Sequence, residues 1–196
     1  MTTRNDVTGL VLAGGRGSRM GGVDKGLQLL DGVPLVQHAL RRLAPQVASL
    51  MINANRNLEV YAQFGVPVWP DAESDFAGPL AGFVAGLAHC ATEWLVTVPC
   101  DTPRFPLDLV ERMTKSVGTA RVAVACTTEE GAVQRQPVFC LMRRDTRADI
   151  VAYLAGGGRK IDTWFDREGC VDVLFEDADA FYNANTAEEL RRLGPT

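Results

Sequence analysis

The residues with the most evident chemistry form a glycine-rich stretch near the start of the chain. It contains five glycines between positions 14 and 22, follows the apolar run 9–13 and precedes Asp24-Lys25. Glycine lets the backbone approach a ligand closely and point its N–H groups toward it. Arg19 and Lys25 add positive charge, since Arg can hold two phosphate oxygens while Lys acts as a point charge. The stretch therefore predicts a phosphate-binding loop.

Two common phosphate-binding patterns do not fit this stretch. A Walker A loop requires Ser or Thr after its lysine, but Gly26 and Leu27 follow Lys25. A dinucleotide fingerprint requires a third glycine where Met20 stands. The other interpretation is a turn with solvated charges, which the combined spacing of Arg19, Met20 and Lys25 disfavours.

Polar residues that follow predicted strands are the second group of candidates. Asp101 comes directly after the apolar run 94–98, and a carboxylate there suits Mg²⁺, which takes one or two carboxylates and completes its shell with phosphates and water. A cap for the helix expected from Pro106 is the alternative. Asn53 and Asp71 also follow short apolar runs, where turn or capping roles are common.

A third candidate is the pattern Gly78-Pro-Leu-Ala-Gly82, with Gly86 further along. Proline is favoured in the first turn of a helix, and a helix N-terminus offers free N–H groups to an anion. Close packing around small residues explains the same glycines without a ligand. We expect Gly78 and Gly82 to face the ligand, and we expect this less of Gly86.

The elements that must position these residues alternate along the chain. Strands are expected at 9–13, 47–53, 66–68, 94–98, 121–126, 138–142 and 171–175, and helices at 35–43, 79–90, 106–117, 145–154, 161–165 and from Thr186. This alternation predicts an α/β fold, with a single-domain, Rossmann-like, mostly parallel sheet and helices on both faces. Ligands then bind outside the carboxyl ends of the strands, at the loops after Leu12, Ile52, Val68 and Val98.

Composition narrows the classes of function. The 196-residue chain has a net charge of −4, and its basic residues are dispersed, so nucleic acid is not expected as a partner. No apolar run approaches the ~18 residues of a membrane span, so no membrane association is expected. The five cysteines form no CxxC pair, and no secretory signal is recognised, so we expect reduced thiols in the cytoplasm.

The loop Leu12-Ala-Gly-Gly-x-x-x-Arg-Met-Gly-x-x-Asp-Lys resembles the signature of the molybdenum cofactor guanylyltransferases, and Pro99-x-Asp101-x-Pro103 resembles their metal-binding motif. The resemblance implies a fold like that of nucleotide-diphospho-sugar transferases. It implies transfer of GMP from GTP to molybdopterin with release of pyrophosphate, with Mg²⁺ bound by Asp101. Cytidylyl relatives usually have Ala-Ala-Gly where this chain has Gly14-Gly15.

The same resemblance implies the site residues. Catalytic roles fall on Arg19, Lys25 and Asp101, and GTP contacts on Leu12, Ala13, Gly14, Gly15, Lys25, Asn53, Asp71, Gly78, Gly82 and Asp101. A carboxylate such as Asp71 can accept from the N1–H and N2–H₂ edge of guanine, although which of Asn53 and Asp71 reads the base stays open. Candidates with weaker support are Gln136-Pro137, Asn183, Asn185, Arg159 and Lys160.

The expected organisation is one domain over 1–196, with the nucleotide part at about 7–118 and the acceptor part at about 119–196. Three alternatives remain: a cytidylyltransferase, a sugar-phosphate nucleotidyltransferase, and a protein that binds guanine nucleotide or molybdopterin without turnover. The resemblance also implies transient contact with cofactor-delivery proteins or molybdoenzymes. His38 and His89 are expected to be structural, which leaves no histidine for nucleophilic catalysis.

Overall fold

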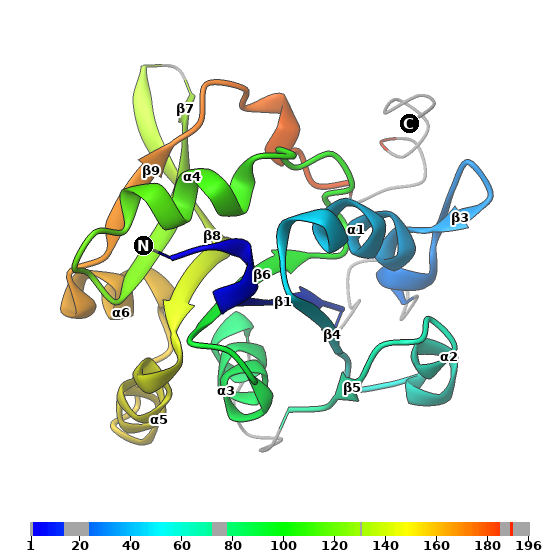
Figure 1. The fold of residues 1–196 in the computed structure, drawn as a ribbon, viewed down its shortest axis with the longest axis horizontal. Coiled ribbons are helices and arrows are strands. Elements are labelled where there is room, and N and C mark those ends of the chain that lie inside the picture. The colour runs from blue at the N-terminus through cyan, green and yellow to red at the C-terminus, as the bar shows by residue number, and fades with distance from the viewer. Residues whose placement is uncertain (1, 14–23, 72–77, 130, 185–188, 190–196) are drawn as a thin grey trace.

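The computed structural model describes residues 2–13, 24–71, 78–129, 131–184 and 189 (Figure 1). Its centre is a seven-stranded sheet of order β5-β4-β1-β6-β8-β7-β9. The strands are β1 (Val7–Leu12), β4 (Ser49–Asn53), β5 (Val68–Trp69), β6 (Trp94–Pro99), β7 (Val122–Glu129), β8 (Ala132–Arg143) and β9 (Val171–Leu174). Four of its six strand pairings are parallel, and both antiparallel pairings involve β8. The predicted mostly parallel sheet is confirmed.

Helices cover both faces of this sheet, as predicted. They are α1 (Leu35–Leu43), α2 (Leu58–Ala62), α3 (Pro79–His89), α4 (Leu109–Ser116), α5 (Arg147–Ala155) and α6 (Ile161–Glu168). Helices α1 and α4 pack on one face, and α3, α5 and α6 pack on the other (Figure 1). A two-stranded hairpin of β2 (Leu29–Leu30) and β3 (Val33–Pro34) precedes α1.

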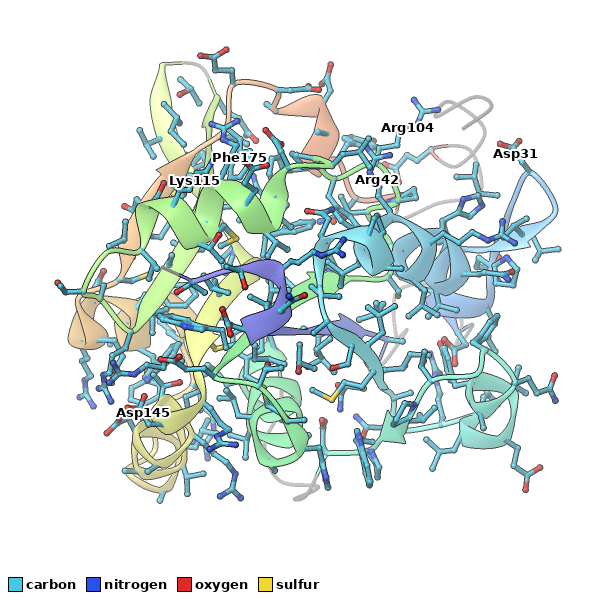
Figure 2. All side chains as sticks on the ribbon, viewed as in Figure 1. Asp31, Arg42, Arg104, Lys115, Asp145 and Phe175 are labelled. Atoms are coloured by element: carbon cyan, nitrogen blue, oxygen red, sulfur yellow. The ribbon has the colours of Figure 1, made fainter. Side chains whose placement is uncertain are left out.

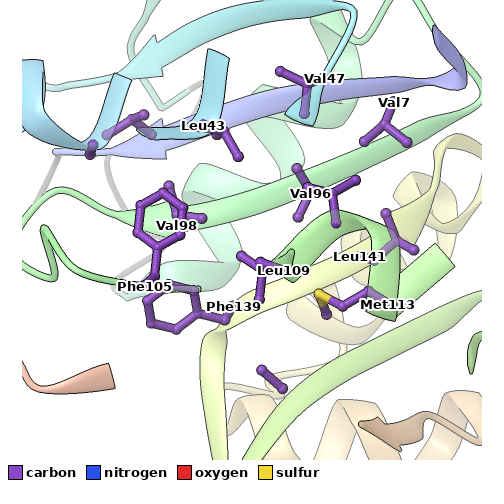
Figure 3. Packing of buried hydrophobic residues seen from close by; sticks show 14 of the residues in the cluster. Val7, Leu43, Val47, Val96, Val98, Phe105, Leu109, Met113, Phe139 and Leu141 are labelled. Atoms are coloured by element: carbon purple, nitrogen blue, oxygen red, sulfur yellow. The ribbon is translucent and has the colours of Figure 1, made fainter. Parts of the chain in front are cut away.

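The two cores follow from residue periodicity. In α1 the apolar side chains Val36, Ala39, Leu40 and Leu43 recur at helical spacing and face one core. In β6, Val96 and Val98 face that core while Leu95 faces the other, because successive strand residues point to opposite faces. Figure 3 shows Leu43, Val96 and Val98 in this core, together with Leu109 and Met113 of α4 and with Phe105 and Phe139.

Several predicted boundaries were wrong. Strand β8 begins at Ala132, well before the predicted start, so Gln136-Pro137 lies inside it. Its register against β7 jumps between Val124–Cys140 and Ala125–Gln136, and this bulge accommodates a proline that cannot donate to the ladder. Helix α4 begins at Leu109 instead of Pro106. The short helix α2 was not predicted, and the helix expected from Thr186 lies outside the described residues apart from Glu189.

The sheet is extended on both sides of β1: the chain first adds β4 and β5 on one side of it, and then adds β6 on the other. The chain passes from β1 through α1 to β4 on one side, and later from β5 through α3 to β6 on the other. The two connections lie on opposite faces, and in open α/β sheets the ligand crevice forms at such a point, here outside the carboxyl ends of β1 and β6. Leu12 ends β1 and pairs with Asn53 and Pro99, which brings three of the predicted site segments to one edge.

Candidate active site

An ion pair joins the loops that follow β1 and β6. Lys25 Nζ lies 3.3 Å from Asp101 Oδ2. The two side chains are 28% and 17% exposed, so both reach solvent but are partly shielded. The structure thus brings together Lys25 and Asp101, two of the three residues to which the family resemblance gives catalytic roles; the third, Arg19, lies outside the described residues.

The backbone around Asp101 is held from two directions. The Cys100 N–H donates to the Leu12 carbonyl at 3.0 Å, which fixes the start of the loop to β1. The Ala184 N–H donates to the Asp101 carbonyl at 2.8 Å, and the Thr102 hydroxyl donates to Asn183 Oδ1 at 2.5 Å. Asn183, a weaker sequence candidate, therefore lies beside the Asp101 loop.

Helix α1 and the 3-10 turn that follows it, Ala44–Gln46, hold the far end of the same loop. Arg42 Nε donates to the Phe105 carbonyl, and Gln46 donates to the Pro106 carbonyl at 3.3 Å. The Gln46 side chain also accepts the Val110 N–H at 3.1 Å, which caps the start of α4. Burial lowers the pKa of Arg42, and nearby Arg104 lowers it further; Figure 2 shows both arginines on the same side of the molecule. No local sequence pattern predicts Arg42 or Gln46 as supports of this loop.

A carboxylate lies at the ends of β4 and β5. Asp71 Oδ1 accepts from Asn53 Nδ2 at 2.9 Å, and Asp71 Oδ2 accepts from Asn55 Nδ2 at 2.7 Å. The Asp71 N–H donates back to Asn55 Oδ1 at 2.8 Å. Each carboxylate oxygen retains acceptor capacity, because a carboxylate offers about four lone-pair positions. Sequence reasoning missed Asn55, although its place two residues after Asn53 at a strand end was a usable signal.

Asn53 itself is buried. Its amide nitrogen donates to both Asp71 Oδ1 and the Trp69 carbonyl, the latter at 3.0 Å, so both of its N–H groups are used within the protein. A Cβ on Gly82 would lie 2.7 Å from Asn53 Oδ1 and 2.6 Å from Leu12 Cδ2. Gly82 thus allows α3 to approach Asn53 and Leu12, and this packing accounts for the glycine whether or not it also contacts a ligand.

Gly78 occupies a different kind of position. Its φ of +103° lies in a region that L side chains rarely adopt, and it immediately precedes Pro79 at the start of α3. Among the described residues, no atom lies within 4 Å of the place where its Cβ would be. Gly86, by contrast, packs against Leu10 and Leu95, as the close-packing interpretation predicts.

Comparison with known proteins shows the family to which this chain belongs. The MobA-like NTP transferase domain matches residues 9–169. A molybdenum cofactor guanylyltransferase from Bordetella petrii is 56% identical over 195 residues, covering 98% of this chain and 100% of the relative. The chain belongs to the molybdenum cofactor guanylyltransferases.

Solved structures confirm the fold expected of this guanylyltransferase family. Molybdopterin-guanine dinucleotide biosynthesis protein A from Archaeoglobus fulgidus aligns with a TM-score of 0.76 at 20% identity, over 94% of this chain and 95% of that chain. The 4-diphosphocytidyl-2C-methyl-D-erythritol synthase from Anaerococcus prevotii aligns with a TM-score of 0.77 at 11% identity, over 96% and 94%. The names of these two proteins refer to different bases, guanine and cytosine, so the shared fold alone does not identify which nucleotide a member binds.

The donor set at Asp101 fits a hard divalent cation such as the Mg²⁺ that the family resemblance implies. A carboxylate oxygen is the ligand type that Mg²⁺ prefers, and the partial exposure of Asp101 leaves room for water and substrate oxygens. Within the described residues, no group of three or more His, Cys, Asp or Glu side chains forms a complete protein cage. The arrangement fits a metal that one carboxylate and the phosphates hold together.

Several predicted site residues are not placed by the structure or lie apart from this edge. Gly14, Gly15, Arg19 and Asn185 fall outside the described residues. Arg159 Nη1 donates to the Leu154 and Gly158 carbonyls at 2.8 and 2.6 Å, beside α5.

The two histidines have structural contacts, as predicted. His38 Nε2 is hydrogen-bonded to the Leu30 carbonyl at 2.9 Å, which joins α1 to the small hairpin. The His89 ring stacks on Trp69 with a centroid separation of 3.5 Å.

Among the described helices, none combines the length and the apolar character that crossing a membrane requires.

Proposed function

We propose that the chain transfers GMP from GTP to the terminal phosphate of molybdopterin, giving molybdopterin guanine dinucleotide and pyrophosphate. Membership of the guanylyltransferase family supports the reaction, since relatives 54–57% identical over nearly their full length carry that name. The single observation that carries the assignment of the site is the Lys25–Asp101 pair at the carboxyl ends of β1 and β6.

The chemistry requires little more than positioning and charge. A phosphate monoester loses its second proton near pH ~6, so the attacking phosphate of molybdopterin is already ionised at neutral pH. No protein base is then needed, which agrees with the structural contacts of His38 and His89. Lys25 would stabilise negative charge on the α-phosphate and on the departing pyrophosphate. Arg19 and the 14–22 loop would add further donors, as the family signature implies.

Asp101 is the residue that we propose holds Mg²⁺. The bound ion would supply charge neutralisation between the phosphates, and Asp101 would fix its place relative to Lys25. The hydrogen bonds from Cys100 and Ala184 hold the backbone of Asp101 in position, so the carboxylate needs little reorganisation to act.

Asp71 is the residue that we propose reads guanine. Its two oxygens are oriented by Asn53 and Asn55 and each keeps acceptor capacity for the N1–H and N2–H₂ groups. Asn53 would act mainly by orienting Asp71, because its own amide hydrogens are used. Adenine and cytosine do not present that pair of adjacent donors, so they would bind less well.

The acceptor half, about 119–196 within a single domain, is the proposed site of molybdopterin. Candidate contacts to molybdopterin in this half are Gln136, Arg159 and Lys160. Asn183, which lies beside the Asp101 loop, and Asn185 are further candidates. Cytoplasmic location and brief contact with cofactor-delivery proteins or molybdoenzymes belong to the same proposal.

The decisive experiment is calorimetric binding of GTP, CTP, ATP and UTP to the pure protein, each with and without Mg²⁺. A preference for GTP over CTP of about 10-fold or more, equivalent to ~1.4 kcal/mol, supports guanylyl transfer. Equal or tighter CTP binding would move the assignment to a cytidylyltransferase and overturn the role of Asp71. GTP binding without pyrophosphate release in the presence of molybdopterin would instead indicate a binding protein.

A further inference from the structure

Asp24, the residue before Lys25, is held by an unusually complete set of partners for a loop carboxylate. Only 8% of it is exposed. Its Oδ1 accepts the Tyr61 hydroxyl at 2.6 Å, and its Oδ2 accepts Asn57 Nδ2 at 2.9 Å. Arg56 Nε forms an ion pair with the same Oδ2 at 3.6 Å. A buried carboxylate is stable only when it is compensated in this way, so these partners fix its position.

Tyr61 anchors this cluster to the core. Tyr61 is fully buried in the hydrophobic cluster that also contains the apolar face of α1. Burial raises its pKa far above the usual range, and the hydrogen bond to Asp24 raises it further, so the phenol stays protonated and continues to donate. A Cβ on Gly26 would lie 2.4 Å from the Tyr61 hydroxyl oxygen, so only glycine at 26 permits this approach.

A short turn transmits the position of Asp24 to its neighbour. The Leu27 N–H donates to the Asp24 carbonyl at 3.2 Å, and the Gln28 N–H donates to the Lys25 carbonyl at 3.0 Å, which defines the 3-10 segment Lys25–Leu27. Asp24 therefore sits at the N-cap of the turn that carries Lys25. Fixing the Asp24 side chain fixes the place where the lysine side chain begins.

We infer that Asp24 is a positioning residue that holds Lys25 opposite Asp101, with Tyr61 and Asn57 as its supports. The near-complete burial of Asp24 and its ion pair with Arg56 favour this positioning role over metal binding. The inference rests on the proposed function, since it takes Lys25 to be a phosphate contact.

The test uses two variants that remove one donor each. Tyr61→Phe deletes the hydroxyl and keeps the ring in the core. Asn57→Gly deletes the amide at an exposed position, and glycine readily adopts the φ of +52° found there. Each should weaken GTP binding by about 3- to 10-fold, the scale of one ordinary intramolecular hydrogen bond. Mg²⁺ dependence should be unchanged, whereas Asp101→Asn should alter it.

Thr146→Val is the matched control. It deletes a fully buried hydroxyl that donates to the Arg143 carbonyl at 2.8 Å, and Arg143 pairs with Trp94 at the opposite end of β6 from Asp101. It should lower the melting temperature while leaving GTP affinity within about two-fold of wild type, since its site is distant and independent. A drop in GTP affinity as large as that of Tyr61→Phe would mean that general destabilisation explains both, and would overturn the inference.

Action through Lys25 is tested by the double variant Tyr61→Phe/Lys25→Ala. A residue that acts only by placing Lys25 has nothing left to place once the ammonium is gone. The double variant should therefore bind GTP as Lys25→Ala does. A further loss equal to the full effect of Tyr61→Phe would overturn the positioning role.

A measurement without nucleotide separates this inference from the proposed function. The NMR signal of the Lys25 ammonium, assigned with Lys25→Ala, reports its contact with Asp101 in the ligand-free protein. It should shift in Tyr61→Phe and Asn57→Gly in the direction seen with Asp101→Asn, and should not shift in Thr146→Val. If wild type bound no GTP, the proposed function would fail, and this signal would still decide the positioning role: an unchanged signal overturns it.

Discussion

Lys25 and Asp101 lie 76 positions apart in the chain, yet their charged groups are 3.3 Å apart at the edge of the sheet. The pair bridges the loop after β1 and the loop after β6, the two strands that flank the crevice. In the absence of a nucleotide, each charge compensates the other. An incoming triphosphate offers Lys25 a stronger set of anionic partners, so binding can exchange this internal pair for contacts to the substrate.

Asp101→Ala should remove most turnover while the fold persists. Loss of the carboxylate removes the proposed Mg²⁺ ligand, whereas the ion pair that it breaks is partly exposed and worth at most about 1 kcal/mol of stability. Pyrophosphate release gives the rate, and thermal unfolding checks the fold. Retention of more than about a tenth of wild-type activity would argue against a metal role for Asp101.

Lys25→Ala should lower kcat as well as kcat/KM. The ammonium is placed to stabilise charge that develops during transfer, and such an interaction is lost from the transition state more than from the ground state. Steady-state kinetics with varied GTP separate the two parameters. An increase in KM alone, with kcat unchanged, would make Lys25 a binding residue only.

Gly82→Ala should weaken GTP binding by about 10-fold and lower stability by ~1–3 kcal/mol, because the new methyl group would overpack against Asn53 and Leu12. The displaced Asn53 would no longer orient Asp71. Gly156→Ala is the control, since its Cβ would lie 3.4 Å from the nearest atom at an ordinary φ of −76°. Calorimetry that showed equal affinities for both variants would contradict the packing argument.

Asp71→Asn should narrow the preference for GTP over ITP. Inosine lacks the 2-amino group, so wild type should bind ITP about 3- to 10-fold more weakly if Asp71 accepts from that group. The asparagine presents an amide in place of one acceptor, and the ratio of the two affinities should approach unity. A ratio that is unchanged in the variant would assign recognition of the 2-amino group to another residue.

Stability should fall as pH rises above about 9. Burial is the main cause that raises the pKa of Cys126 to about 12, so this thiol stays protonated in the folded chain. Once the chain is unfolded, the thiol ionises near its ordinary pKa of 9.0. A raised folded pKa gives stability that is complete below the unfolded pKa and is lost above it. Urea unfolding from pH 8.5 to 10.5 should show a slope up to ~1.4 kcal/mol per pH unit shallower in Cys126→Ala than in wild type. Equal slopes would contradict this contribution.

The alternation of apolar runs, glycine loops and amphipathic segments predicted the strands and helices because it reflects local periodicity. It predicted α1 at its observed bounds, Leu35–Leu43, since the apolar stripe and the preceding proline are both local signals. It did not predict the first half of β8, where Gln134 to Pro137 lack strand character. That segment is a strand because β7 pairs with it, and its bulge is a tertiary feature.

The sequence by itself determined which residue types are candidates for the site: a glycine-rich stretch with Arg19 and Lys25, and polar residues after successive strands. It also determined the family, through motifs with fixed spacing. Only the tertiary structure decided which of these groups meet. It paired Lys25 with Asp101, joined Asp71 to Asn53 and Asn55, and buried Asp24 against Tyr61. These contacts link residues far apart in the chain, and they depend on the strand order at β1, which local periodicity does not encode.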